Sequence, residues 1–409
     1  MTLIEPSQEN PKTKIMSALS SKPKKSVLSR KLFGEEWASL ESTDENSEFH
    51  IEKIRDHLKL MLTSNRLLVL AGSGTSIGAT AEKTGGPSMW ELWESISKIK
   101  NFKEVKALIK FSIEGDIEGF LSHCHNAEPF IPEAKVEMVQ KLVIEAEGLI
   151  FKACSEFLKN EPNLPNHEKF LSRLIRRRNK APRPVIFTTN YDRCFELAAS
   201  KLSLTVIDGF TYSQPRFFDP NLFGYDFIRR SNHATESNEL LDGVFHLLKV
   251  HGSVDWQLDS SQITQRLEPD PTKRCLIYPA STKYQKSYVQ PYLEMMARFL
   301  TSLREPQTSL LVVGFGFNDD HLSAPIFSAL QSNPSLNVVA ISPSIEAQFK
   351  ENKVNLSWKK LKEEALDPQS RVTLLNCDFG QLVNLIPDLK ALSPDQRLAA
   401  SIRGVAKNP

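Results

Sequence analysis

Four segments of the sequence place residues that could bind or act on a nucleotide at the end of short apolar runs. They are residues 72–78, 187–192, 249–253 and 311–319. Glycine lets the backbone turn tightly and approach a phosphate closely. Asparagine supplies an amide, and histidine supplies a base that works near neutral pH. The shared position of these residues predicts one site assembled from four loops.

The first segment, residues 72–78, carries glycines at the spacing G-x-G-x-x-x-G. Its backbone amides, with those of a following helix start, are expected to bind a pyrophosphate. The spacing differs from the G-x-G-x-x-G of dehydrogenases, which disfavours hydride transfer. A valine at Gly74 is expected to weaken binding, because its side chain would occupy the place of the pyrophosphate. The alternative is a plain turn between a strand and a helix.

Two further segments carry the candidate catalytic residues Asn190, Asp192 and His251. Asn190 can orient water or ribose hydroxyls, Asp192 can add negative potential, and His251 can act as a general base. Helix capping is the alternative for Asn190 or Asp192, and a structural role is the alternative for His251. Since Asn190 and His251 fall at strand ends, alanine at either position is expected to abolish activity and leave folding intact.

The elements that must position these residues alternate along the chain. Short apolar runs predict strands at residues 66–71, 184–188, 205–207, 244–250, 274–277, 309–313, 337–341 and 371–375. Helical patterns lie between them, for example at residues 191–201, 287–303 and 319–330. This alternation predicts an α/β fold with a doubly wound, mostly parallel, Rossmann-like sheet. Ligands of such sheets bind at the carboxyl ends of the strands, which is where the four segments fall.

The domain organisation follows from composition and periodicity. Residues 1–50 are rich in Ser, Thr, Lys, Pro and Glu and predict a flexible N-terminal tail. Residues 51–409 predict one nucleotide-binding domain, with a helical insertion at about residues 101–165. A run of basic residues between Arg173 and Arg183 is interpreted as a solvated helix face and not as a phosphate or nucleic-acid site.

Bulk properties exclude several classes of protein. The formal net charge of +2 over 409 residues gives no global attraction to nucleic acid. No apolar run reaches the roughly 20 residues of a membrane helix, and the N-terminus lacks a signal-peptide core. The five cysteines lie far apart without C-x-x-C spacing. A cytoplasmic protein without a zinc or redox motif is therefore expected.

The ordered set of motifs resembles the sirtuin family. The G-A-G-x-S phosphate loop of that family is similar to residues 72–76, with Ser73 in place of alanine. The T-Q-N-x-D element is similar to residues 188–192, with Thr189 in place of glutamine, and the H-G element is similar to residues 251–252.

More narrowly, the chain resembles sirtuin-like NADases of bacterial anti-phage systems, especially those encoded with a HerA-type ATPase. The residues that carry this resemblance are 186–192, 248–253, 276–279 with 283–284, 306–308 and 314–317. The resemblance spans roughly residues 65–345.

The resemblance implies that NAD is the substrate and is hydrolysed to nicotinamide and ADP-ribose, with depletion of NAD during infection. Asn190, His251 and Asp192 would form the catalytic group. The residues expected to contact NAD are Gly72, Ser73, Gly74, Thr75, Ser76, Thr188, Gly314, Phe315 and Gly316.

Two alternatives remain open, a protein deacylase and a non-catalytic sensor of NAD or ADP-ribose. Protein deacylases of the sirtuin family carry a four-cysteine zinc module after the H-G element, whereas this chain has only Cys275 between His251 and Gly314. No zinc is therefore expected, and the deacylase is disfavoured. The resemblance further implies a large homo-oligomer that docks onto a HerA-type ATPase, contact with nucleic acid only through that partner, and no membrane association.

Overall fold

The computed structural model describes residues 29–31, 37–39, 47–160, 162–177, 181–230, 239–270, 273–276, 290–367 and 370–389. Most of the predicted tail, and residues 277–289 with much of the motif at 276–284, therefore lie outside the described residues.

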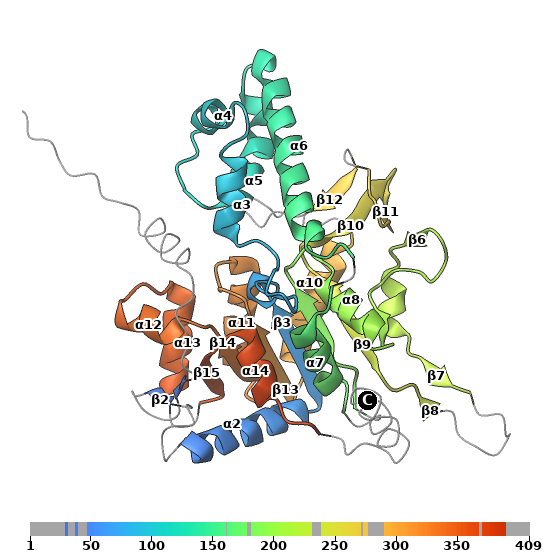
Figure 1. Ribbon diagram of the computed structural model, residues 1–409, viewed down its shortest axis with the longest axis vertical. Coiled ribbons are helices and arrows are strands. Elements are labelled where there is room, and N and C mark those ends of the chain that lie inside the picture. The colour runs from blue at the N-terminus through green and yellow to red at the C-terminus, as the bar shows by residue number, and fades with distance from the viewer. Residues whose placement is uncertain are drawn as a thin grey trace, which may run out of the picture.

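Seven parallel strands form the centre of the main sheet, in the order β15–β14–β13–β3–β4–β9–β5. They are β3 (Arg66–Ala71), β4 (Val185–Thr188), β5 (Thr205–Ile207), β9 (Val244–Lys249), β13 (Thr308–Val313), β14 (Asn337–Ile341) and β15 (Val372–Asn376). Most of their side chains are buried on both faces, as expected of a parallel sheet covered by helices. The predicted Rossmann-like α/β fold is confirmed (Figure 1).

Helices cover both faces of this sheet and bury two separate cores. Along β3, Leu67 and Val69 point into one core and Leu68 and Leu70 into the other, because successive side chains of a strand face opposite ways. The first core lies under α2 (Ser47–Leu62), α7 (Pro165–Leu174), α8 (Cys194–Lys201) and α14 (Phe379–Leu385). The second lies under α10 (Tyr292–Arg304), α11 (Asp320–Ser332), α12 (Ile345–Lys350) and α13 (Leu356–Leu366).

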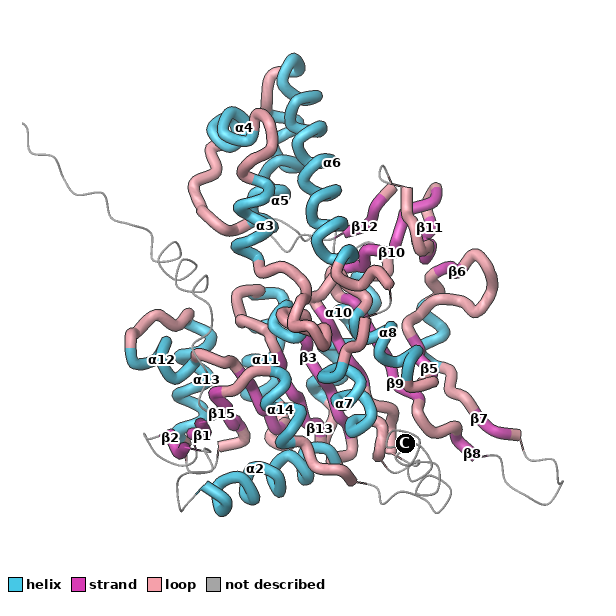
Figure 2. The backbone as a smooth tube through the Cα atoms, in the orientation of Figure 1, coloured by secondary structure: helices cyan, strands magenta, loops and turns pink. Residues whose placement is uncertain are grey.

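A second, antiparallel sheet was not predicted. Its strands, in the order β12–β10–β11–β6, are β12 (Arg274–Leu276), β10 (Gly252–Asp259), β11 (Gln262–Gln265) and β6 (Arg216–Phe217). The assignment of residues 274–277 to the parallel sheet was therefore wrong, since β12 pairs with β10. A short ribbon of β7 (Ile228–Arg229) and β8 (Glu239–Leu240) stands apart from both sheets (Figure 2).

The edge of the main sheet beside β15 carries two short strands from the N-terminal region. β1 (Ser29–Lys31) pairs antiparallel with β15, and β2 (Trp37–Ser39) pairs antiparallel with β1. Both strands fall within the segment that the sequence predicts as a tail.

A helical module stands above the main sheet (Figure 1). It contains α3 (Met89–Ile96), α4 (Phe102–Leu108), α5 (Ile117–Ala127) and α6 (Glu133–Glu156), and its helices share a third hydrophobic core. The module begins before the predicted insertion at 101–165 and includes the two tryptophans of α3. Val254 of β10 belongs to this core and Tyr191 packs against it, so the module contacts the loop that carries Asn190.

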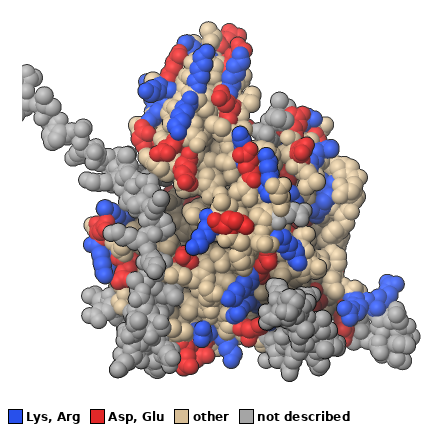
Figure 3. Space-filling view, viewed as in Figure 1, with Lys and Arg blue, Asp and Glu red and all other residues tan. Residues whose placement is uncertain are grey.

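Shorter turns complete the described structure. They are the 3-10 helices η1 (Ser73–Thr75), η2 (Glu128–Phe130) and η3 (Pro220–Gly224). Acidic and basic side chains are interspersed over the helical module on the face shown in Figure 3. Among the described residues, no helix is long and apolar enough to cross a membrane.

Candidate active site

The loops that follow β3, β4, β9 and β13 meet at one edge of the main sheet. Neighbouring strands reach this edge together, since Ala71 pairs with Thr188 and with Val313, and Thr188 pairs with Lys249. β3 lies between β4 and β13, so the sheet continues from β3 through β4 on one side and through β13 on the other. Such a point of divergence opens a crevice between loops, where ligands of doubly wound sheets bind.

The glycine loop after β3 packs directly on the loop after β13. The amide of Gly72 donates to the carbonyl of Val313 at 2.9 Å, and that of Gly74 donates to the carbonyl of Gly314 at 2.9 Å. Gly314 has a φ of +62°, a conformation that favours glycine. A Cβ added to Gly74 would lie 2.6 Å from Cα of Gly314. The reason given for a Gly74→Val defect was therefore wrong: the side chain would collide with the Gly314 backbone.

The glycine loop continues as η1 and not as an α-helix. Within it the amide of Thr75 donates to the Gly72 carbonyl at 3.0 Å, and the amide of Ser76 donates to the Ser73 carbonyl at 3.0 Å. The next α-helix begins only at Met89. A short 3-10 helix therefore follows the first glycine, and the expectation of free amides at a helix start was wrong, since most amides of the loop are satisfied inside the protein.

Asn190 ties the loop after β4 to the glycine loop. It is 7% exposed, and its Nδ2 lies 3.0 Å from the Gly72 carbonyl, 3.0 Å from Oγ1 of Thr75 and 2.8 Å from Oγ of Ser76. Two amide hydrogens are thus shared among three acceptors. Its backbone amide donates to Oγ1 of the buried Thr188 at 3.1 Å. Among the described residues, none donates a hydrogen bond to Oδ1, which leaves that oxygen for a ligand.

Asp192 is buried and uses both carboxylate oxygens within the protein. Oδ2 accepts the Ser76 hydroxyl at 2.6 Å, and Oδ1 accepts the amide of Cys194 at 3.0 Å, at the start of α8. The carboxylate therefore anchors the glycine loop and supports the first turn of a helix. Of the two interpretations of Asp192, this geometry favours the structural one.

The buried Lys249 and the half-buried Glu196 form an ion pair beneath the Asn190 turn. Nζ of Lys249 lies 3.0 Å from Oε1 of Glu196 and also donates to the carbonyl of Asp192. Burial raises the pKa of Glu196, an effect that the charge of Lys249 opposes. A buried charge persists only with a partner. A lysine at the end of an apolar strand is a sequence signal for such a pair, and the site prediction does not include it.

His251 lies against Asp319, a residue that the site prediction missed. Nε2 of His251 is 2.9 Å from Oδ2 of Asp319, and their side chains are 8% and 9% exposed. The other oxygen of Asp319 accepts the amide of His321 at 3.0 Å, where Asp319 caps α11. Burial raises the pKa of Asp319, but His251 and the His321 amide outweigh burial, so the pKa lies below its usual range.

The loop after β13 presents mainly backbone atoms, and few side-chain atoms, to a ligand. Phe315 is buried and its ring packs 5.2 Å from the ring of Phe317, inside the second core. The carbonyl of Gly316 accepts Nδ2 of Asn355 at 2.9 Å. Of the residues predicted to contact a ligand here, Phe315 and Gly316 can therefore do so mainly through backbone atoms.

An open cavity of about 360 Å³ lies beside the glycine loop. It is lined by Ile77, Gly78, Lys83, Gly85, Gly86, Pro87, Glu91 and Ala153. The cavity lies between the end of the glycine loop and the helices α3 and α6. Its volume falls in the usual range for a small-molecule site.

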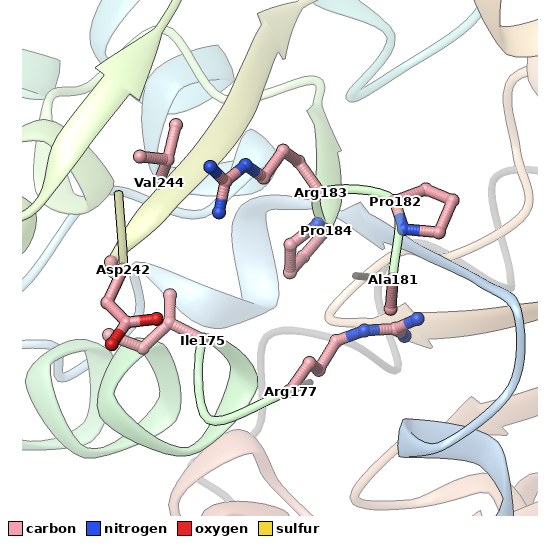
Figure 4. A pocket seen from close by; sticks show the side chains of 9 residues that line it. Ile175, Arg177, Ala181, Pro182, Arg183, Pro184, Asp242 and Val244 are labelled. Carbon is pink, nitrogen blue, oxygen red and sulfur yellow. The ribbon is translucent and has the colours of Figure 1, made fainter. Parts of the chain in front are cut away.

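Two arginines of the basic run at 173–183, Arg177 and Arg183, line a cavity of about 10 Å³ at the amino ends of β4 and β9, with room for about one water. Arg177 is buried, and its Nη2 donates to the Ser64 and Asn65 carbonyls at 2.6 and 2.9 Å. Burial lowers its pKa to about 10. Arg183 pairs with Asp226 at 2.8 Å, and the two guanidinium groups do not converge (Figure 4). The interpretation of this run as a solvated helix face was wrong for these two arginines.

No group of three His, Cys, Asp or Glu side chains suited to a metal ion occurs in the part of the chain that the structure describes.

Comparison with known proteins yields one family match. Residues 184–366 match the family described as SIR2-like domain, which supports a sirtuin-like family for this chain. The match includes the loops after β4, β9 and β13, while the glycine loop lies outside it. No curated protein matches the chain.

Among solved structures, the chain is similar to a cytosolic 5'-nucleotidase IIIB bound to cytidine. The identity is 11%, the TM-score is 0.26, and the alignment covers 76% of this chain and 83% of that one. A similarity of this size supports no inference about fold or function.

Proposed function

We propose, from the SIR2-like match across the loops of Asn190 and His251, that this protein hydrolyses NAD to nicotinamide and ADP-ribose. The observation that carries the proposal is the position of these two residues. Both lie just past the carboxyl ends of adjacent parallel strands, and Asn190 is hydrogen-bonded to the glycine loop. Sirtuin-like domains bind NAD, and the crevice between the loops is where a doubly wound sheet would hold it.

The reaction breaks the bond between C1′ of the ribose and the ring nitrogen of nicotinamide. The electron pair of that bond goes to the ring nitrogen, which loses its positive charge, so the leaving group needs no general acid. The transition state resembles an oxocarbenium ion. A water oxygen bonds to C1′, and the proton that this water loses goes to His251 and then to solvent. One NAD and one water give one ADP-ribose, one nicotinamide and one proton.

The side chains divide this work between them. Oδ1 of Asn190 orients the water or a ribose hydroxyl, because Nδ2 is already bonded to the glycine loop. His251 is the base. Asp192 holds the loop in place through Ser76 and makes no contact with the substrate. The pyrophosphate lies against the glycine loop and the backbone of residues 314–316.

The biological role that we propose is depletion of NAD in anti-phage defence, within a large homo-oligomer docked onto a HerA-type ATPase. Support comes from the motifs that resemble such NADases. The helical module is a candidate for transmitting the state of the partner, since it packs on Tyr191, next to Asn190. A partner that binds the competent state more tightly would shift the population toward activity.

A non-catalytic sensor of NAD or ADP-ribose is the second candidate. It is favoured by the hydrogen bonds that already satisfy Nδ2 of Asn190 and the amides of the glycine loop. In this alternative the crevice binds the nucleotide without activating water.

One experiment separates the two. The purified protein is incubated with NAD, alone and with its co-expressed ATPase, and nicotinamide is quantified by chromatography while NAD binding is followed by calorimetry. Nicotinamide released without any acyl-peptide supports the hydrolase. Binding without release in either mixture supports the sensor and contradicts the hydrolase.

A further inference from the structure

We propose that Asp319 is the positioning residue of His251, fixing its proton on Nε2 so that Nδ1 is the atom that accepts a proton from water. The catalytic consequence rests on the proposed function, whereas the position of the proton does not.

The contact itself limits where the proton lies. Nε2 of His251 is 2.9 Å from Oδ2 of Asp319, which is within hydrogen-bond distance. The ring N–H does not point directly along the line between the two atoms. An ionised carboxylate has only acceptor positions. A nitrogen lone pair this close to the carboxylate would be repelled, whereas an N–H is attracted to it, so hydrogen on Nε2 is the favoured arrangement.

The carboxylate is itself fixed by the backbone. Its Oδ1 accepts the His321 amide at 3.0 Å, at the N-terminus of the thirteen-residue helix α11. A helix N-terminus stabilises negative charge. Burial of both side chains keeps water from competing for Oδ2. Asp319 is therefore held ionised with one oxygen directed at the imidazole.

The remaining ring nitrogen is the one available for chemistry. A neutral imidazole with hydrogen on Nε2 has its lone pair on Nδ1. Nδ1 makes no hydrogen bond with any residue that the structure describes. When Nδ1 takes a proton, the nearby carboxylate stabilises the imidazolium that forms, as in other histidine–carboxylate pairs.

A plain helix cap is the competing explanation, and Asp319→Asn separates the two roles. Asparagine caps helices about as well as aspartate, so its oxygen can still accept the His321 amide. Its amide group then faces Nε2 as a donor, which favours a lone pair on Nε2 and hydrogen on Nδ1. Asp320→Asn is the matched control, because Asp320 is the next residue of the chain and is exposed.

The test is ¹⁵N NMR of protein labelled at histidine, at about pH 9, well above the ordinary histidine pKa. The His251 signals are identified by their loss in His251→Gln. We expect a protonated Nε2 and an unprotonated Nδ1 in the wild type and in Asp320→Asn, and the reverse in Asp319→Asn. A protonated Nδ1 in the wild type, or no change in Asp319→Asn, overturns the proposal.

A kinetic test measures kcat and KM for NAD hydrolysis by the same proteins. Asp319→Asn should lower kcat on the order of 10²- to 10⁴-fold, with KM little changed and a thermal midpoint close to that of the wild type. Asp320→Asn should keep both constants. Full activity in Asp319→Asn also overturns the proposal. If the wild type releases no nicotinamide but the NMR pattern reverses as expected, the positioning role stands and the proposed function fails.

Discussion

Replacing Lys249 by methionine should destabilise the protein strongly, because it leaves Glu196, whose side chain is only 16% exposed, without its lysine partner. Lys249 is 4% exposed, and its ammonium group bonds to Glu196 and to the Asp192 carbonyl. Removing one member of a fully buried ion pair costs about 3–5 kcal/mol, and the partial exposure of Glu196 places this pair toward the lower end of that range. The free energy of unfolding of an ordinary protein is about 5–15 kcal/mol, so this single change removes a large fraction of that free energy.

The double variant Lys249→Met, Glu196→Leu should recover much of the loss, since an apolar replacement of both charges is often neutral. The control is Lys141→Met, whose pair with Glu137 has side chains 74% and 79% exposed. An exposed pair of this kind contributes little to stability, because water and salt screen the two charges.

The assay is urea unfolding followed by circular dichroism, at one pH and one protein concentration. A loss below about 1 kcal/mol in Lys249→Met, close to that of the Lys141 control, would refute the view that the pair is held in a low-dielectric environment. A double variant no more stable than the single variant would show that Lys249 acts through the Asp192 carbonyl instead.

Further predictions concern folding and the glycine loop. Burial lowers the pKa of His167 from 6.5 to about 4. The folded protein keeps this ring neutral while the unfolded chain binds the proton, so stability is lost as pH falls from 6.5 toward 4, by about 3 kcal/mol in total. Unfolding of His167→Phe should show a smaller pH dependence over that range, and an unchanged dependence would contradict the assignment. Gly74→Ala should cost about 1–3 kcal/mol, because its Cβ meets the Gly314 backbone, whereas Gly224→Ala, with nothing within 4 Å, should cost far less. Equal midpoints in thermal unfolding would argue against close packing of the two loops. Asn190→Ala should abolish nicotinamide release and also lower the thermal midpoint, since three contacts to the glycine loop are lost. A midpoint equal to that of the wild type would mean that these contacts add nothing to stability.

The parallel sheet could be predicted from the sequence because each strand is a short apolar run bounded by turn residues. The short length of the run and the turn residues on either side identify such a strand without its partners. Residues 274–276 illustrate the limit, since their composition suits a strand in either sheet. Only pairing with the distant β10 places them in the antiparallel sheet.

The candidate site was predicted in the same way and with the same limit. Asn190 and His251 stand out as polar residues at the ends of apolar strands. Asp319 lies in the segment 311–319 that the sequence singles out, but its contact with His251 joins loops from strands that are not neighbours in the sheet. The expectation that Asn190→Ala would leave folding untouched rested on its strand-end position, and it overlooked the bonds to the glycine loop.

The most direct test of the account is nicotinamide release from NAD by the wild type and by His251→Ala, measured in the presence of the proposed HerA-type ATPase. His251→Ala removes only the ring, and matching circular dichroism spectra establish that both proteins are folded. The account predicts release of nicotinamide and ADP-ribose in equal amounts by the wild type and none above background by His251→Ala. Equal release by both folded proteins, or release by neither, would contradict hydrolysis of NAD at this site.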